Sequence, residues 1–351
     1  MGYVQSTSDP CIYTSSEGET SVIGVYVDDF VIATKDTEKF EEVKAALSEK
    51  FDVKDLGRLH YFLGVQVIQD EEKGTIWIGQ PTFTESILQK YGMCEAKPVK
   101  TPVCVNSKLL KASEESELTD QSLYQSAVGS LLYLATRTRL DIAFAVNNVA
   151  RYCSKPTKPH WIAVKRIFRY LRGTTHFGLL YSRGSGAPTP IGYSDADWGG
   201  DCNDHKSTTG YLFQIGGTAV TWKCKKQSSV ALSTAESEYM ALSSAAQEAV
   251  WIRELNSDLG NPQSQPTLIY EDNQSAIAMA KNPQFHGRSK HIGIKYHFIR
   301  EQVSNDKICL QYCPTEDMIA DILTKGIGPE KFEKLRKMCG MCDQVSSEKE
   351  C

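Results

Sequence analysis

The succession of elements that the sequence predicts after Phe177 is the strongest constraint on the fold. Four short strands are expected first, and a long helix and then alternating strands and helices follow them. This order is typical of a mixed sheet with helices packed over it, so we predict an α/β fold for this half. The expected strands lie at 177–182, 189–195, 210–215, 218–223, 267–271 and 307–312, and the expected helices at 235–258, 273–281, 290–304 and 316–325.

The first half of the chain predicts hairpins and then helices. Hairpins are expected at Val22–Thr34, where apolar residues flank two acids, and at 61–79, which turns at a charged segment. The stretch 95–120 has two prolines, many charged residues and little periodicity, so we predict a linker there. The expected helices lie at 37–50, 81–91, 121–136, 141–154 and 159–172.

The average charge gives little reason to expect a nucleic-acid partner, because 39 Lys and Arg face 43 Asp and Glu, for a net charge of -4. The distribution of charge does give one. Between Arg151 and Ser194 the chain has eight Lys and Arg and no acid. A solvated helix face is the plain alternative, but solubility does not require such segregation, so we favour phosphate contacts. The candidates are Lys165, Arg166, Arg169 and Arg172.

Two further segments have groups suited to nucleic acid. The segment 286–300 has basic residues and three histidines without an acid, and Arg288 and Lys290 are its candidates for phosphate contacts. Asn273 and Gln274 follow a predicted strand, and their polar groups can meet the 2′-hydroxyls of RNA. Asn273 is equally suited to cap the helix after it, and the two roles can coexist.

Cysteine content and hydropathy bear on the compartment. Eleven cysteines, an odd number, are spread along the chain, and no apolar signal segment follows Met1. This favours a reducing, intracellular compartment, cytoplasmic or nuclear, over secretion. The longest apolar runs fall far short of the ~20 residues that a membrane span needs, so we expect no membrane partner. The sequence assigns no oligomeric state.

Two acids lie at the ends of predicted strands. Asp195 comes after Ile191 and Tyr193, and Asp272 comes after Leu268–Tyr270. Open α/β sheets place their sites at strand ends. Both carboxylates are therefore candidate site residues.

Two more acids lie on apolar helix faces. Glu238 shares its face with Leu242 and Ala245, whereas Glu236 lies on a largely wet stripe. A carboxylate on a core-facing stripe is costly unless something pairs with it, so Glu238 rather than Glu236 is the anomaly. Asp321 is similarly surrounded by apolar residues in the last predicted helix.

Four crowded carboxylates raise one another's pKa unless divalent cations neutralise them. Oxygen ligands favour Mg²⁺ or Mn²⁺ over zinc. Two such ions ~4 Å apart can activate a water and stabilise the leaving oxygen of a phosphodiester. The alternative is four unrelated surface or capping acids, because 43 acids in one chain supply many chance quartets.

Seven short motifs occur in one order along the second half of the chain. They are Gly192–Trp198, Lys206–Tyr211, Ala235–Leu242, Asp272–Ala276, Lys290–Ile292, Tyr296–Arg300 and Ala320–Lys325. Together they resemble the ribonuclease H domain of copia-type LTR retrotransposon polyproteins and cover roughly 188–337. The set is highly specific, although each motif alone is not.

The resemblance implies a ribonuclease H-like mixed five-stranded sheet with flanking helices, which cleaves the RNA strand of RNA/DNA hybrids with two Mg²⁺. By motif position, the catalytic, metal-binding acids of the family fall on Asp195, Glu238, Asp272 and Asp321. The helix-face argument selects Glu238 independently. Asp197 remains an alternative to Asp195, because residues i and i+2 share a strand face. Asp317 remains an alternative to Asp321, one helical turn away.

The first part of the chain resembles the reverse transcriptase of the same elements. Tyr26–Asp29 in a hairpin turn resembles the polymerase signature, and Asp55–Gly57 and Tyr61–Gly64 resemble the palm segment that follows it. The resemblance implies that Asp28 and Asp29 are metal ligands of a polymerase remnant. The family's polymerase needs a third Asp on an upstream strand, whereas the acids before Asp28 lie in polar sequence. We therefore expect that this chain alone does not polymerise DNA.

The element pattern and the resemblance together divide the chain into five parts. These are a truncated reverse-transcriptase palm and thumb at 1–94, a linker at 95–120, a helical connection at 121–176, a ribonuclease H-like domain at 177–326 and a C-terminal helical tail at 327–351. The leading interpretation is an RNA/DNA-hybrid endoribonuclease attached to an incomplete reverse transcriptase. The alternatives are an inactive relic that only binds nucleic acid, a chain classed simply as a reverse transcriptase, and an interaction remnant that folds poorly.

Overall fold

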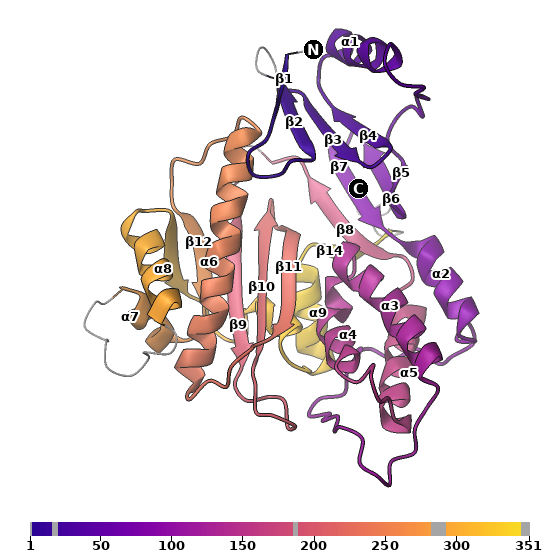
Figure 1. The fold of residues 1–351 in the computed structure, drawn as a ribbon, viewed down its shortest axis with the longest axis vertical. Coiled ribbons are helices and arrows are strands. Elements are labelled where there is room, and N and C mark those ends of the chain that lie inside the picture. The colour runs from indigo at the N-terminus through magenta and orange to yellow at the C-terminus, as the bar shows by residue number, and fades with distance from the viewer. Residues whose placement is uncertain (1, 16–19, 185–188, 282–292, 345–351) are drawn as a thin grey trace.

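The computed structural model describes residues 2–15, 20–184, 189–281 and 293–344. Within these ranges the strands form three sheets, one of four strands and two of five (Figure 1). None of the helices described there has the length and apolar character to cross a membrane.

The first sheet is antiparallel and has the strand order β1-β2-β3-β4. Its strands are β1 (Tyr3–Gln5), β2 (Ile12–Ser15), β3 (Val22–Tyr26) and β4 (Asp29–Ala33). Helix α1 (Thr37–Ser48) packs on this sheet through Val43 and Leu47, and Ile23 completes a small core. The side chain of Asp36 caps α1 by accepting from two backbone N–H groups of its first turn. The predicted hairpin and the helix after it are confirmed.

The second sheet joins strands from distant parts of the chain. Its order is β14-β8-β7-β6-β5, and all four pairings are antiparallel. The strands are β5 (Tyr61–Phe62), β6 (Val65–Asp70), β7 (Thr75–Gly79), β8 (Phe177–Ser182) and β14 (Met341–Asp343). The expected grouping of 177–182 with the strands after it is wrong, because β8 pairs with β7 instead.

A pair of glycines explains why β8 fits beside β7. Gly79 and Gly178 are opposite each other in the register, and the buried indole of Trp77 packs over both. A Cβ atom on Gly178 would lie 2.5 Å from Trp77 Cε2 and 2.3 Å from the carbonyl oxygen of Ile78. A side chain at this position would therefore push the two strands apart.

The middle of the chain is a layer of helices around the largest hydrophobic core. Val128, Leu131, Val146 and Phe168 are among the fully buried residues of that core. The stretch 95–120, between the first two of these helices, has turns but no helix or strand. The helical elements are α2 (Pro81–Lys90), α3 (Gln121–Arg137), the 3₁₀ helix η1 (Leu140–Ile142), α4 (Ala143–Ala150) and α5 (Lys158–Arg172).

The third sheet is mixed and has the order β11-β10-β9-β12-β13. Strands β9, β10 and β11 are antiparallel neighbours, whereas β12 runs parallel to both β9 and β13. The strands are β9 (Ile191–Asp197), β10 (Thr208–Ile215), β11 (Thr218–Lys226), β12 (Thr267–Glu271) and β13 (Ile308–Tyr312). The mixed five-stranded sheet predicted for the second half of the chain is confirmed.

Helices cover both faces of this sheet. The long helix α6 (Thr234–Asp258) crosses one face, with α7 (Gln274–Lys281) and α8 (Gly293–Ser304) beside it (Figure 1). Phe213, Leu242 and Ile269 meet in the core beneath α6. The short 3₁₀ helix η3 (Ile319–Leu323) and α9 (Pro329–Met338) contribute to the large core on the other side.

The last predicted helix, at 316–325, is wrong in kind. The structure has the 3₁₀ helix η3 instead, and all five of its residues are buried. Gly210 on β10 allows this close approach, because a Cβ atom there would lie 2.6 Å from Thr324 Cγ2 and 2.8 Å from Leu323 Cβ. Packing on every side, rather than an amphipathic period, decides the conformation of this segment.

Candidate metal centre

Three carboxylates from three different elements meet beside the central strand of the third sheet. Asp195 lies on β9, Glu238 on α6, and Asp272 directly after β12. One oxygen atom of each lies within 4.8 Å of the others. In the part of the chain that the structure describes, no other group of three or more His, Cys, Asp or Glu residues is gathered in this way.

The start of α6 explains why Glu238 rather than Glu236 enters this group. The hydroxyl of Ser233 caps α6 by accepting from the N–H of Glu236 at 3.2 Å. The Glu236 carboxylate accepts in turn from the N–H of Leu232 at 3.0 Å. The backbone and the carboxylate of Glu236 therefore both form hydrogen bonds at the N-terminus of α6. Glu236 is as buried as Glu238, each being 6% exposed, which corrects the wet stripe expected for it.

Burial dominates the electrostatics of the centre. It raises the pKa of Asp195 to about 6, and the repulsion from Asp321 and Asp272 adds to the rise, whereas Lys325 opposes it. Burial also raises the pKa of Glu238 well above its usual value, and the carboxylates of Asp195, Glu271 and Asp272 raise it further. Both carboxylates are therefore harder to ionise than free ones, and a nearby cation would offset this cost.

The three residues fit a divalent cation. All three donors are carboxylate oxygens, the ligands that hard divalent cations prefer. Glu238 Oε2 is buried and has no hydrogen-bond partner, which is costly unless an ion or a proton satisfies it. The three carboxylate oxygens, which lie within 4.8 Å of one another, would hold such an ion.

Asp321, the fourth predicted ligand, lies outside this group and is held by two lysines. Its Oδ1 lies 2.7 Å from Lys325 Nζ and its Oδ2 lies 2.9 Å from Lys331 Nζ. Lys325 Nζ also lies 3.4 Å from Asp195 Oδ1, so this lysine bridges Asp321 and the centre. Burial opposes the charge of Lys325, but Asp195 and Asp321 together raise its pKa above the usual value.

The structure places the two alternative acids, Asp197 and Asp317, outside the three-carboxylate group. Burial raises the pKa of Asp197 to about 7, and its carboxylate accepts from the backbone N–H of Thr208 on the neighbouring strand. Asp317 is half exposed and pairs with Lys334 at 2.7 Å. It lies before η3, not on a common α-helix with Asp321.

Three residues that the sequence analysis did not single out border the centre. Glu271 is completely buried beside Asp272. Burial raises the pKa of Glu271 well above the usual value, and repulsion from Asp195 and Asp272 raises it further. Thr324 donates its hydroxyl to Asp195 Oδ2. Lys325 is the third. The period of two in β12, which buries positions 267, 269 and 271, was a usable signal for Glu271 only.

Of the four residues of α5 predicted to contact phosphate, the three arginines bind another segment of the chain and the lysine does not. Arg166 donates to the Thr101 hydroxyl at 3.0 Å, and Arg169 donates to the carbonyl oxygen of Lys97 at 2.8 Å. Arg172 donates to the carbonyl oxygen of Cys94. These three guanidinium groups hold the segment 94–101 against α5, whereas Lys165 is exposed.

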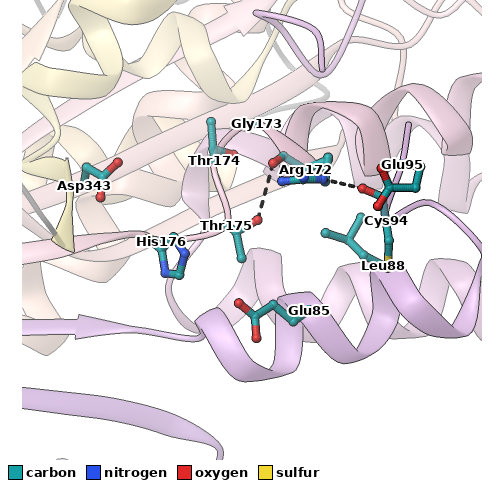
Figure 2. Close-up of a pocket in the computed structure, with 10 residues that line it drawn as sticks. All are labelled: Glu85, Leu88, Cys94, Glu95, Arg172, Gly173, Thr174, Thr175, His176 and Asp343. Carbon is teal, nitrogen blue, oxygen red and sulfur yellow. Dashed lines mark hydrogen bonds between the residues drawn. The ribbon is translucent and has the colours of Figure 1, made fainter. Parts of the chain in front are cut away.

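Arg172 also lines a cavity at the C-terminal end of α5, whose lining residues Figure 2 shows. The cavity has a volume of about 320 Å³. Glu85, Glu95 and Asp343 line the same cavity, and none of the three carboxylates of the metal centre does. Three acids around one guanidinium disfavour a phosphate group. The cavity therefore gives no support to Arg172 as a phosphate contact.

The remaining predicted residues that the structure describes lie outside the three-carboxylate group. Asn273 caps α7 by accepting from the N–H of Ala276 at 3.0 Å, and Gln274 is exposed on its first turn. Arg288 and Lys290 lie outside the described residues. Asp28 and Asp29 are exposed at the turn between β3 and β4, and no third acid of the described residues forms a metal-binding group with them.

The chain has relatives among transposon proteins. Residues 1–105 match the family described as "Reverse transcriptase (RNA-dependent DNA polymerase)". Over 97% of its length the chain is 40% identical to the retrovirus-related Pol polyprotein from transposon TNT 1-94 of Nicotiana tabacum, and it covers 26% of that protein. It is 33% identical to a putative transposon Ty5-1 protein of Saccharomyces cerevisiae, over 70% of this chain and 76% of that protein. The chain spans about a quarter of the length of the Pol polyproteins that it matches.

A solved structure shares the fold. The foamy viral protease-reverse transcriptase, solved in complex with an RNA/DNA hybrid, has a TM-score of 0.51 and 17% sequence identity with this chain. The likeness covers 84% of this chain and 36% of the viral one. At this identity it shows a common fold.

Proposed function

Because the chain belongs to the Pol polyprotein family of retrotransposons, we propose that it is a metal-dependent ribonuclease that cleaves the RNA strand of RNA/DNA hybrids. The observation that carries the proposal is the meeting of Asp195, Glu238 and Asp272 beside the central strand of the mixed five-stranded sheet. The hybrid as substrate is supported by the viral protein of the same fold, which was solved with one.

The oxygen-only donor set suits Mg²⁺ or Mn²⁺. Bound there, a divalent ion supplies an activated water at neutral pH and neutralises charge on the scissile phosphate. The residues of the chain hold and orient the centre. Thr324 donates to Asp195, and Thr315 donates to Asp272 Oδ2 at 2.8 Å, so that two of the three carboxylates are fixed by hydroxyl groups.

A second ion, as the family resemblance implies, needs another pair of carboxylates. Asp195 and Asp321 are the pair nearest to that role, and Lys325 lies between them. The proposed hydrolysis therefore rests on the group of three carboxylates. Asp28 and Asp29 have no part in it, since they form no group of three with another acid of the described residues.

Contacts with the hybrid are proposed for the exposed side chains near the centre and on α5. Gln274 follows Asp272 on the first turn of α7, where an exposed amide can meet a 2′-hydroxyl. Lys165 is exposed on the outer face of α5 and is suited to phosphate contacts. Arg288 and Lys290 remain candidates from the sequence.

The test uses a hybrid with labels on both strands, purified chain and Mg²⁺. We expect cleavage of the RNA strand, and the Asp272→Asn substitution should slow it by roughly a hundredfold or more. Asp317→Asn is the matched control, because Asp317 lies outside the centre, and it should leave the rate nearly unchanged. Tight binding of the hybrid without cleavage by the unsubstituted chain would support the inactive relic instead.

A further inference from the structure

Lys325 lies between two of the carboxylates that the sequence predicted as metal ligands. Its Nζ atom is 2.7 Å from Asp321 Oδ1 and 3.4 Å from Asp195 Oδ1. Both carboxylates are 1% exposed, whereas the lysine side chain is 37% exposed. The ammonium group thus reaches from the edge of the site into the position between two buried anions.

The two sides of the centre differ in how their charge is compensated. On one side, both oxygens of Asp321 have an ammonium partner, because Lys331 lies 2.9 Å from Oδ2. On the other side, no lysine or arginine of the described residues forms an ion pair with the carboxylate of Glu238 or Asp272, whereas Asp321 has two such pairs. The side with Asp321 is therefore satisfied by the chain itself, and the side with Glu238 and Asp272 is the one that lacks a cation.

We propose that Lys325 is a built-in cation of this centre, which fills the position between Asp195 and Asp321 and leaves one position for a divalent ion, at Asp195, Glu238 and Asp272. The inference deepens the proposed ribonuclease function and rests on it. It makes this centre a combination of one exchangeable ion and one fixed ammonium group.

The backbone that carries Lys325 and the second ammonium partner of Asp321 are both held in place by their surroundings. The segment is pressed against β10 at Gly210, and Thr324, the residue before Lys325, is completely buried. Lys331 is anchored as well, since it donates to the carbonyl oxygen of Thr315 at 2.8 Å. Asp321 is thus held from both sides, and a divalent ion between Asp195 and Asp321 would meet the positive charge of Lys325 at short range.

The experiment counts ions. The metal-free chain is titrated with Mn²⁺, and free Mn²⁺ is followed by electron paramagnetic resonance. We expect one tight ion per unsubstituted chain, and its loss in Asp272→Asn. Lys325→Met should gain a second ion, or bind it roughly tenfold more tightly or better, because a unit positive charge is removed from its position. Lys331→Met is the matched control, because Lys325 remains in place there, and it should stay at one ion.

Two results would overturn the inference alone. One is two tight ions in the unsubstituted chain that both depend on Asp195, and the other is the same number and affinity of ions in Lys325→Met as in the unsubstituted chain. The absence of any ion that depends on Asp272 would overturn both the inference and the proposed function, so the two failures are distinguishable.

A second variant and a second measurement test the inference in case Lys325→Met does not fold. Lys325→Gln keeps a hydrogen-bond donor between the two carboxylates but removes the fixed charge. The melting temperature of this variant should rise more on addition of Mn²⁺ than that of the unsubstituted chain, because it gains a position for an ion. An equal rise in the two proteins would contradict the inference.

Discussion

The hydroxyl of Thr324 donates a hydrogen bond to Oδ2 of Asp195, although 129 positions separate the two residues. Thr324 directly follows η3, and it is completely buried. A carboxylate from the central strand of the third sheet is therefore oriented by a segment close to the C-terminal end of the described chain. Thr324 can orient Asp195 in this way only when that segment is packed against β10.

Removing this hydroxyl should reduce the rate rather than the affinity. We expect Thr324→Val to lower kcat for hybrid cleavage by about tenfold or more, with little change in KM, because a freed Asp195 is less well oriented. Thr324→Ser should restore most of the rate. Thr136→Val on the exposed face of α3 is the control. A fall in KM and kcat together in Thr324→Val would indicate a different role.

The structure leads to opposite expectations for Asp195 and Asp197. We expect Asp195→Asn to abolish Mn²⁺ binding at the centre, because Asp195 belongs to the three-carboxylate group. Asp197→Asn should retain the ion, because the Asp197 carboxylate accepts from the N–H of Thr208 on β10 and lies outside the group. Mn²⁺ titration of both variants checks this, and loss of the ion in Asp197→Asn alone would reverse the assignment.

The metal-free chain should become less stable as the pH rises from about 4 to about 7. Burial raises the pKa of Asp195 from 3.8 to about 6, so the folded state keeps a proton that the unfolded state releases. The free energy of unfolding therefore falls over this range, by on the order of 3 kcal/mol for this residue if it titrates alone. Glu238 changes the stability in the same direction, since its pKa is also raised.

Urea unfolding in EDTA across this pH range measures the effect. The free energy of unfolding of Glu238→Gln should fall less with pH than that of the unsubstituted chain. The substitution removes one carboxyl group with a raised pKa, and the neighbouring carboxylates then ionise with less repulsion. Added Mg²⁺ should flatten the fall, since it stabilises the ionised carboxylates. A slope that neither Mg²⁺ nor Glu238→Gln changes would place its origin elsewhere.

The basic residues of α5 should separate into two classes. We expect Lys165→Ala to weaken hybrid binding and to reduce the slope of log affinity against log salt by about 1, because an exposed phosphate contact is lost. Arg169→Ala should instead loosen the segment 94–101, since Arg169 donates to the carbonyl oxygen of Lys97. Filter binding at several salt concentrations and limited proteolysis measure the two effects. A reduced salt slope in Arg169→Ala with an intact 94–101 segment would contradict this division.

The carboxylates of the centre were largely predictable, because strand ends and helix faces have fixed periods. Glu238 could be selected from its apolar neighbours on α6, although the contrast with Glu236 was wrong, because Glu236 is equally buried. The pairing of Asp321 with Lys325 inside the site could not be predicted. The sequence shows the lysine four positions after Asp321, but this spacing is the same for a pair on the surface and for a pair in the site. The contact depends on η3 being a buried 3₁₀ helix, and that conformation comes from packing against Gly210.

The partners of strands and of charged side chains were harder to predict. The pattern of β8 indicates a strand, but its place beside β7 depends on the contact of Gly178 with Trp77, about 100 positions apart. The run of basic residues in α5 was visible, but the carbonyl oxygens of Lys97 and Cys94 that occupy Arg169 and Arg172 belong to a segment without periodicity. Local sequence patterns predict the type of an element but not the elements or side chains that it contacts.

The pairing of β7 with β8 and of β8 with β14 also constrains the order of events during synthesis. Within the second sheet, strands β5, β6 and β7 are synthesised before the other two, and the edge of β7 stays unpaired until Phe177–Ser182 has been made. β8 in turn waits for Met341–Asp343, which comes after every strand of the third sheet. An unpaired edge of this kind is open to wrong partners. The newly made chain is therefore most vulnerable to misassembly until its last described strand has docked.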